Sequence, residues 1–168
     1  AIEIAAYFAF IGANVDIICE QKEFTDSTQE RLNGLLEFYA KQTKDEKDDF
    51  LKARDKVSYL APEDKLSKKY FLFIETQQEL KSKKETVTQL AGSLNKECLL
   101  ASTSEKYSID LLCNHLAIEE KERFVGLQFV SPVPLVNVVE IVYSYWSKEQ
   151  TIRSIYEFFG HHGKYPCL

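Results

Sequence analysis

The sequence predicts an α/β domain with a mainly parallel sheet and helices on both faces. Short apolar segments rich in Val, Ile and Phe alternate along the chain with longer segments of helical periodicity. This alternation is typical of a parallel sheet connected by crossover helices. The length of 168 residues and the apolar content of 45% suit one domain with a sizeable core, so we expect residues 1–168 to form a single domain.

The first helix and the strand after it resemble part of a nucleotide-binding unit. Ile4 and Phe8 recur at helical spacing, and Gly12 ends the helix where a left-handed residue is needed. A short strand over residues 15–19 follows, with Glu20 at its carboxyl end. A helix, a glycine, a strand and an acid make the second half of a dinucleotide-binding βαβ unit, in which the acid binds the adenosine ribose. The alternative is that Glu20 is a solvated turn residue.

The first half of such a unit is not in the sequence. A strand and the turn GxGxxG should precede residue 4, because only glycine lets backbone amides approach a pyrophosphate, yet only Ala1-Ile2-Glu3 stands there. The chain also contains no methionine and stops on the start of a strand, Lys164-Tyr165-Pro166-Cys167-Leu168. We therefore expect a processed product or the ordered part of a longer protein, incomplete at both ends.

The remaining elements follow from the same periodicities. Charged residues of the helix over 77–94, including Lys83, are expected on a solvated face. In the last helix Ile152, Ile155, Tyr156 and Phe159 form the predicted buried stripe. Helices are expected over residues 25–43, 44–56, 77–94, 109–119 and 147–159, and strands near residues 57–60, 70–75, 97–102, 124–130 and 136–142.

The last two of these strands form the most informative stretch, Phe124 to Val142. Pro132 and Pro134 exclude a helix interior or a central strand between them, so they predict a rigid corner with the two strands antiparallel across it. Glu140 is the only charge in the stretch. A carboxylate in so apolar a segment is either paired or functional, because burying it unpaired is costly.

This stretch resembles a known signature. Gly-Leu-Gln-Phe-Val-Ser-Pro-Val-Pro followed by Val-Val-Glu-Ile-Val is similar to the GLHFFNPVP…LVEVI signature of the NAD-dependent 3-hydroxyacyl-CoA dehydrogenases. The resemblance implies a Rossmann-like NAD-binding domain over nearly the whole chain, with Glu20 in place of the family's ribose-binding aspartate. Gln128 stands where the family has its catalytic histidine, and Ser131 where it has an active-site asparagine.

The resemblance assigns roles to other positions. Glu140 matches the glutamate that orients the catalytic histidine, and the catalytic serine falls on Ser104 or, without a gap, on Glu105. Glu3 falls on a glycine position of the phosphate-binding turn, where its charge would oppose a diphosphate, so NAD binding is doubtful. The helices over 25–56 match a pair that holds the CoA moiety in the family; from the residues alone, a solvated amphipathic hairpin is the simpler interpretation.

Composition excludes other classes of function. A net charge of −5 with acids and bases well mixed argues against nucleic-acid binding, and no apolar run approaches the roughly 20 residues of a membrane span. The four cysteines have no metal-ligand spacing, and the adjacent His161 and His162 lack a third ligand, so we expect no metal. Free thiols indicate a reducing, intracellular compartment, mitochondrial or cytoplasmic.

Three functions remain open on these residues. The first is a catalytically degenerate dehydrogenase-like domain, a pseudoenzyme, that binds a protein partner or supports a larger assembly. The second is a working oxidoreductase of fatty-acid metabolism with a rearranged site. The third is a sensor that binds a nucleotide or an acyl-CoA without chemistry.

Overall fold

The computed structural model describes residues 1–19, 22–42, 45–64, 66, 69–133 and 135–168. The chain divides into two compact units. The first contains residues 1–65 and 131–136, and the second contains residues 66–130 and 137–168. Both combine parallel strands with helices, which confirms the predicted α/β class.

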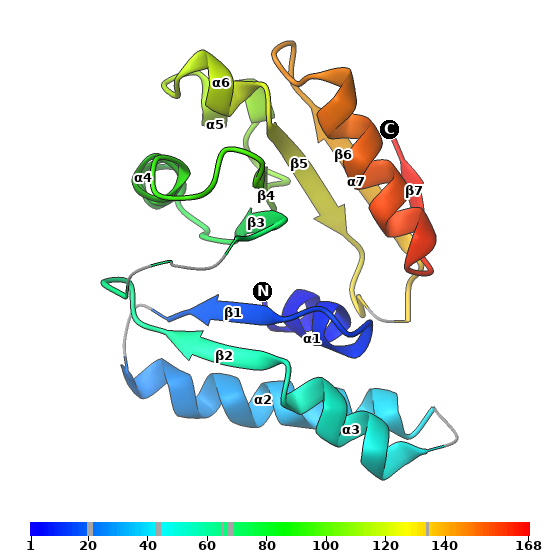
Figure 1. Ribbon diagram of the computed structural model, residues 1–168. Helices are drawn as coiled ribbons and strands as arrows, with labels where there is room; N and C mark the ends of the chain where they lie inside the picture. Colours follow the sequence, from blue (N-terminus) through cyan, green and yellow to red (C-terminus); the bar gives the residue numbers. More distant parts are fainter. Residues whose placement is uncertain (20–21, 43–44, 65, 67–68, 134) are drawn as a thin grey trace. The chain divides into compact units, whose positions relative to one another are not determined.

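The described part of the first unit combines a two-stranded parallel sheet with helices (Figure 1). Its strands are paired from Val15 opposite Val57 to Ile18 opposite Leu60. The helix termination predicted at Gly12 is confirmed, because Gly12 has the left-handed φ of +88°. The elements in chain order are α1 (Ile2–Phe10), β1 (Val15–Ile18), α2 (Lys22–Ala40), α3 (Glu46–Arg54) and β2 (Val57–Leu60).

Small residues let the helices of this unit pack closely. Three alanines of α1 and Ala53 of α3 lie in one core cluster with Leu32, Leu36 and Tyr39 of α2. Burial raises the pKa of Tyr39 to about 12. The helical pair predicted after the first strand is therefore present as α2 and α3, with Leu32, Leu36 and Tyr39 of α2 and Ala53 of α3 buried.

The second unit contains a five-stranded sheet in the order β3-β4-β5-β6-β7. Neighbouring strands are parallel except β5 and β6, which are antiparallel as predicted for the two sides of the proline corner. The Ser131–Pro132 peptide bond at that corner is cis, and Pro134 lies outside the described residues. The elements are β3 (Leu72–Glu75), α4 (Leu80–Ala91), β4 (Leu99–Ser102), α5 (Ile109–Cys113), α6 (Ile118–Lys121), β5 (Phe124–Phe129), β6 (Val138–Tyr143), α7 (Glu149–His161) and β7 (Tyr165–Cys167).

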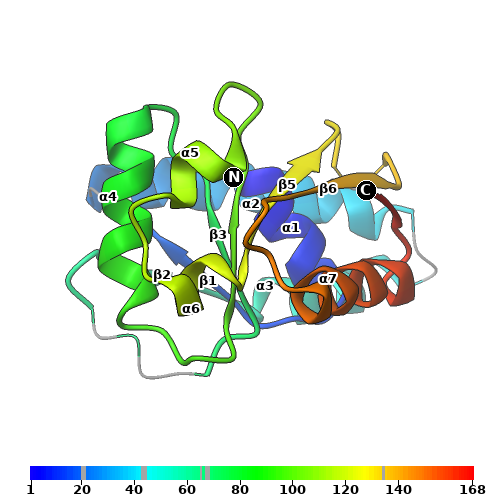
Figure 2. The same ribbon diagram turned by 90° about the horizontal axis from the view of Figure 1, so that it is seen from above.

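Helices cover opposite faces of this sheet (Figure 2). Gly126 of β5 lies against Ile109 of α5, and a Cβ at Gly126 would come within 2.7 Å of that side chain. Phe129, whose side chain points to the other face, packs edge-on against Phe159 of α7 at 5.7 Å between ring centroids. Residues with even numbers in β5 therefore face α5, and those with odd numbers face α7.

Three details differ from the prediction. The helix expected over 109–119 is two helices, because the side chain of Glu120 accepts the Ala117 N–H and starts a new turn there. The last helix continues through Gly160 to His161, and the left-handed residue after it is Gly163, with φ +80°. Its Tyr156 is exposed, and Thr151 is buried in the predicted stripe instead.

Candidate functional site

Gln128 and Glu140 face each other across the antiparallel pair β5–β6. Residues directly opposite each other project to the same side of a sheet. The side chains of Gln128 and Glu140 therefore lie on the face of the sheet that α5 covers at Gly126. Gln128 is half-buried and Glu140 is exposed. The register continues into β7, where Cys167 lies opposite Glu140. The structure thus places the two motif residues opposite each other on neighbouring internal strands of the sheet.

The loop after β4 supplies the third predicted residue. Ser104 is buried, its backbone carbonyl accepts a hydrogen bond from the Gln128 side-chain amide, and its hydroxyl accepts the Tyr107 N–H at 3.0 Å. Glu105, the alternative for the family's serine position, is exposed. Of the two, Ser104 is the residue in contact with Gln128.

This arrangement has an amide, not an imidazole, at the position that corresponds to the family's base. A carboxamide such as Gln128 is neutral and remains a hydrogen-bonding group only, whereas a histidine exchanges its proton near pH 7. The three histidines of the chain are elsewhere in the second unit. His115 contacts the Thr88 hydroxyl of α4 at 2.8 Å, and His161 and His162 lie at the end of α7.

A buried ionic cluster at the ends of β3 and β4 supports the Ser104 loop. Lys83 Nζ lies 3.0 Å from Glu75 Oε2, and the Ser102 hydroxyl donates to the same oxygen at 2.6 Å. Lys83 also donates to the Thr103 carbonyl at 3.1 Å, and Glu75 accepts the Gln77 N–H. Both charged side chains are almost fully buried, at 3% and 0% exposed. The cluster joins the two strand ends just before Ser104.

The prediction that Lys83 lies on a solvated face is therefore wrong. Val87 and Ala91, at intervals of four residues after Lys83, are buried on the same face of α4. This spacing was visible in the sequence and places Lys83 on the apolar stripe. Its charge is tolerated there because Glu75 at the end of β3 pairs with it.

Ser131 lies in the first unit and binds a carboxylate of the same unit. Its hydroxyl donates to Glu3 Oε2 at 2.8 Å, and the Val133 N–H donates to the same oxygen at 3.0 Å. These hydrogen bonds, the one from Val133 foremost, lower the pKa of Glu3 and keep it ionised. Glu20, the predicted ribose-binding acid, lies outside the described residues.

The fixed charge of Glu3 does not fit a diphosphate at the N-terminus of α1. Glu3 stands in the first turn of this helix, where the amino-terminal end of the helix dipole favours negative charge. A nucleotide diphosphate would have to approach a carboxylate that is already held at that end. The described residues therefore do not provide the anion-binding turn of a dinucleotide site.

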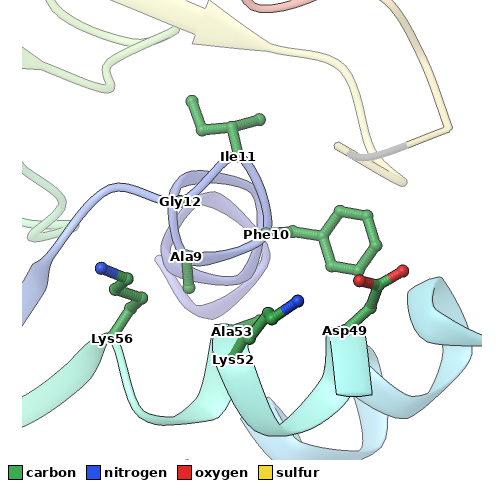
Figure 3. Close-up of a pocket in the computed structure, with 8 residues that line it drawn as sticks. All are labelled: Ala9, Phe10, Ile11, Gly12, Asp49, Lys52, Ala53 and Lys56. Atoms are coloured by element: carbon green, nitrogen blue, oxygen red, sulfur yellow. The ribbon is translucent and has the colours of Figure 1, made fainter. Parts of the chain in front are cut away.

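A cavity of about 570 Å³ lies in the first unit between the end of α1 and α3 (Figure 3). Ala9, Phe10 and Ala53 provide apolar surface, and Lys52 is engaged in an ion pair with Asp48. None of the residues that the sequence predicts for chemistry lines this cavity.

The described residues show neither a cluster of metal ligands nor a helix that could span a membrane. Within the described ranges no three His, Cys, Asp or Glu side chains gather as a metal site would require. The four cysteines, all described, are free thiols. No helix in the described part of the chain has both the length and the apolar character needed to cross a membrane.

Solved structures with the same fold define the class of protein. The 3-hydroxybutyryl-CoA dehydrogenase of Escherichia coli superposes with a TM-score of 0.89 at 22% identity, over 98% of this chain and 34% of that one. The (S)-3-hydroxybutyryl-CoA dehydrogenase of Ralstonia eutropha superposes with a TM-score of 0.88 at 22% identity, over 98% of this chain and 58% of that one. The class is a Rossmann-like α/β domain.

The sequence identifies the family within that class. Residues 1–168 match the family described as 3-hydroxyacyl-CoA dehydrogenase, NAD binding domain, so the chain belongs to this family. The mitochondrial hydroxyacyl-coenzyme A dehydrogenase of Sus scrofa is 33% identical over 87 residues, which are 52% of this chain and 27% of that protein. The chain thus matches about a quarter of the length of that curated relative, and the resemblance stated from the sequence is confirmed.

Proposed function

We propose that this chain is a catalytically degenerate 3-hydroxyacyl-CoA dehydrogenase-like domain with a structural or interaction role in a larger protein or assembly. The observation that carries the proposal is the side chain at the position of the family's base. Gln128 faces Glu140 in register, but its amide is bound to the Ser104 carbonyl and cannot accept a proton.

Loss of the base removes the step on which the chemistry depends. Oxidation of a 3-hydroxyl requires a group that takes its proton while hydride leaves for NAD, and a histidine has a pKa suited to this transfer. Removing a general base typically lowers the rate by roughly 100- to 10,000-fold. Glu140 has the place of an orienting carboxylate, as in a Ser-His-Asp triad, but no imidazole lies between it and a substrate.

Two further residues support the proposal, because they affect substrate positioning and cofactor binding. Ser131, in place of the family's asparagine, is used within the chain, because its hydroxyl donates to Glu3. Glu3 in turn brings a negative charge to the end of α1 where a diphosphate would bind. Proton removal, substrate positioning and cofactor binding are each weakened by a different residue, so one substitution should not restore the enzyme.

An acyl-CoA or nucleotide sensor is the second candidate. The helical pair α2–α3, which the family uses for the CoA moiety, is present and packed on α1. Such a sensor needs no base and is compatible with Gln128. The free cysteines favour a reducing compartment for either function, and the Sus scrofa relative is a mitochondrial protein.

The test is NADH formation from a short-chain 3-hydroxyacyl-CoA. Three proteins are compared: the unaltered protein, Gln128→His, and Gln150→His as a matched control on the exposed face of α7. We expect no turnover from any of them, because Gln128→His restores a base but leaves Glu3 in place. Turnover of the unaltered protein at roughly 1 per second or faster, the usual enzyme range, would overturn the proposal. Activity in Gln128→His alone would show an intact cofactor site and favour the sensor.

A further inference from the structure

The turn between β6 and α7 displays two aromatic rings to solvent. Tyr145 is 89% exposed and Trp146 is 43% exposed. Their rings are perpendicular, with centroids 5.5 Å apart. Tyr and Trp are enriched in protein interfaces, where one rigid ring buries a large area when a partner binds. Tyr145 therefore buries little of its surface within the unit, whereas Trp146 is more than half covered.

Hydrogen bonds fix the backbone that carries the rings. The Ser144 N–H donates to the Ser147 hydroxyl at 3.0 Å, and the Trp146 N–H donates to the Ser144 hydroxyl at 3.1 Å. The Ser147 hydroxyl donates to the carbonyl of Phe124, the first residue of β5, at 2.7 Å. Because these hydrogen bonds hold the turn, little conformational entropy is lost when the rings are covered.

The charges around the turn leave a carboxylate without a counter-ion. Asp110 Oδ1 accepts the Tyr145 N–H at 3.4 Å, and no ion pair joins Asp110 to another described residue. The two lysines of this region are already engaged. Lys121 lies over the Trp146 ring at 5.1 Å from its centroid, and Lys148 pairs with Glu122 at 2.7 Å. The Asp110 carboxylate is therefore held at the backbone of the residue that carries the exposed Tyr145 ring.

We propose that Tyr145, Trp146 and Asp110 form a docking surface for a protein segment that carries arginine or lysine. The cation lies on the face of the Tyr145 ring and is hydrogen-bonded to Asp110, in the way that Lys121 already lies on Trp146. This inference rests on the proposed interaction role and names the surface that serves it.

The charge argues against other occupants. A second copy of the chain would bring two Asp110 carboxylates toward each other, and each chain has a net charge of −5. Nucleic acids and anionic lipid surfaces would be repelled for the same reason. The surface is also separate from the Gln128 site, because the turn is tied to the amino end of β5 and Gln128 lies near its carboxyl end.

The test uses a fluorescently labelled octa-arginine peptide and the 168-residue chain, with anisotropy as the readout and octa-glutamate as the comparison. The variants are Tyr145→Ala and Asp110→Asn; the asparagine keeps the acceptor for the Tyr145 N–H and removes only the charge. Tyr165→Ala is the matched control, because Tyr165 is 72% exposed on β7. We expect both variants to weaken octa-arginine binding about fivefold or more, and the control to change it less than about twofold.

Three outcomes would contradict the inference. Equal affinity in all four proteins would show general attraction to an acidic chain, and binding of octa-glutamate would exclude a cationic partner. Sedimentation that shows a dimer abolished by Tyr145→Ala would assign the surface to a second copy. NADH turnover by the unaltered protein would overturn the degenerate function while leaving the peptide result unchanged, so the two failures are distinguishable.

Discussion

Replacing Lys83 with methionine tests the buried ionic cluster of the second unit. Methionine keeps the length of the side chain and leaves Glu75, which is fully buried, without its cation. Breaking a buried ion pair by removing one partner costs about 3–5 kcal/mol, a large share of the roughly 5–15 kcal/mol that stabilises a typical domain. The hydrogen bond to the Thr103 carbonyl is lost as well. The assay is urea unfolding followed by the fluorescence of Trp146, the only tryptophan, which lies in the same unit.

A control and a compensating change make this result specific. Lys81→Met, two residues before Lys83 in α4, removes a lysine whose side chain is 86% exposed and whose carboxylate partner is 3.8 Å away, so we expect a loss below about 1 kcal/mol. Adding Glu75→Gln to Lys83→Met should regain part of the stability, because the unpaired charge is gone. Equal midpoints for Lys81→Met and Lys83→Met would refute the assignment of Lys83 to a buried pair.

Three further predictions concern packing and protonation. Gly126→Ala should lower the free energy of unfolding by about 1–3 kcal/mol, because its Cβ would come within 2.7 Å of Ile109. Gly34→Ala should raise the free energy of unfolding by about 0.5–1 kcal/mol, because Gly34 lies inside α2 and an added Cβ meets no atom within 4 Å. Urea unfolding measures both changes. Arg123→Lys should cost about 1.5–3 kcal/mol in the same assay, because the guanidinium donates to three backbone carbonyls that an ammonium cannot reach together. Burial raises the pKa of the Cys98 thiol from 9.0 to about 11, so the folded state holds this proton more tightly than the unfolded state does. The resulting contribution to stability is complete below pH 9 and is lost as the pH rises through 11. Cys98→Ala should therefore flatten the decline of the free energy of unfolding over that range.

Local patterns were sufficient to predict most of the strands. The apolar segments around Val57, Leu99, Val125 and Val139 form strands close to the predicted positions, since apolar side chains on both faces require a covered sheet. The antiparallel turn of the chain at the proline corner also followed from the sequence, and it brought Gln128 opposite Glu140. Predictions that depend on local sequence therefore succeeded where burial and backbone preference agree.

Contacts between distant segments could not be predicted in the same way. Glu3 and Ser131 are separated by 128 positions, and nothing near either residue indicates the other. Lys83 was misplaced because a lysine is normally solvated, and its acceptance in the core depends on Glu75 of another element. Long-range partners decide the cost of a buried charge, so a single sequence shows the charge without its compensation.

The division of the chain has a consequence for synthesis on the ribosome. The first unit consists of residues 1–65 together with residues 131–136, so its last piece is made about 65 residues after the rest. At 5–20 residues per second this delay lasts roughly 3–13 s. During that interval Glu3 has neither the Ser131 hydroxyl nor the Val133 N–H to bind, and the surface that buries Val133 stays open. A nascent chain stalled before residue 131 should therefore expose this surface to chaperones, and one released after residue 136 should not.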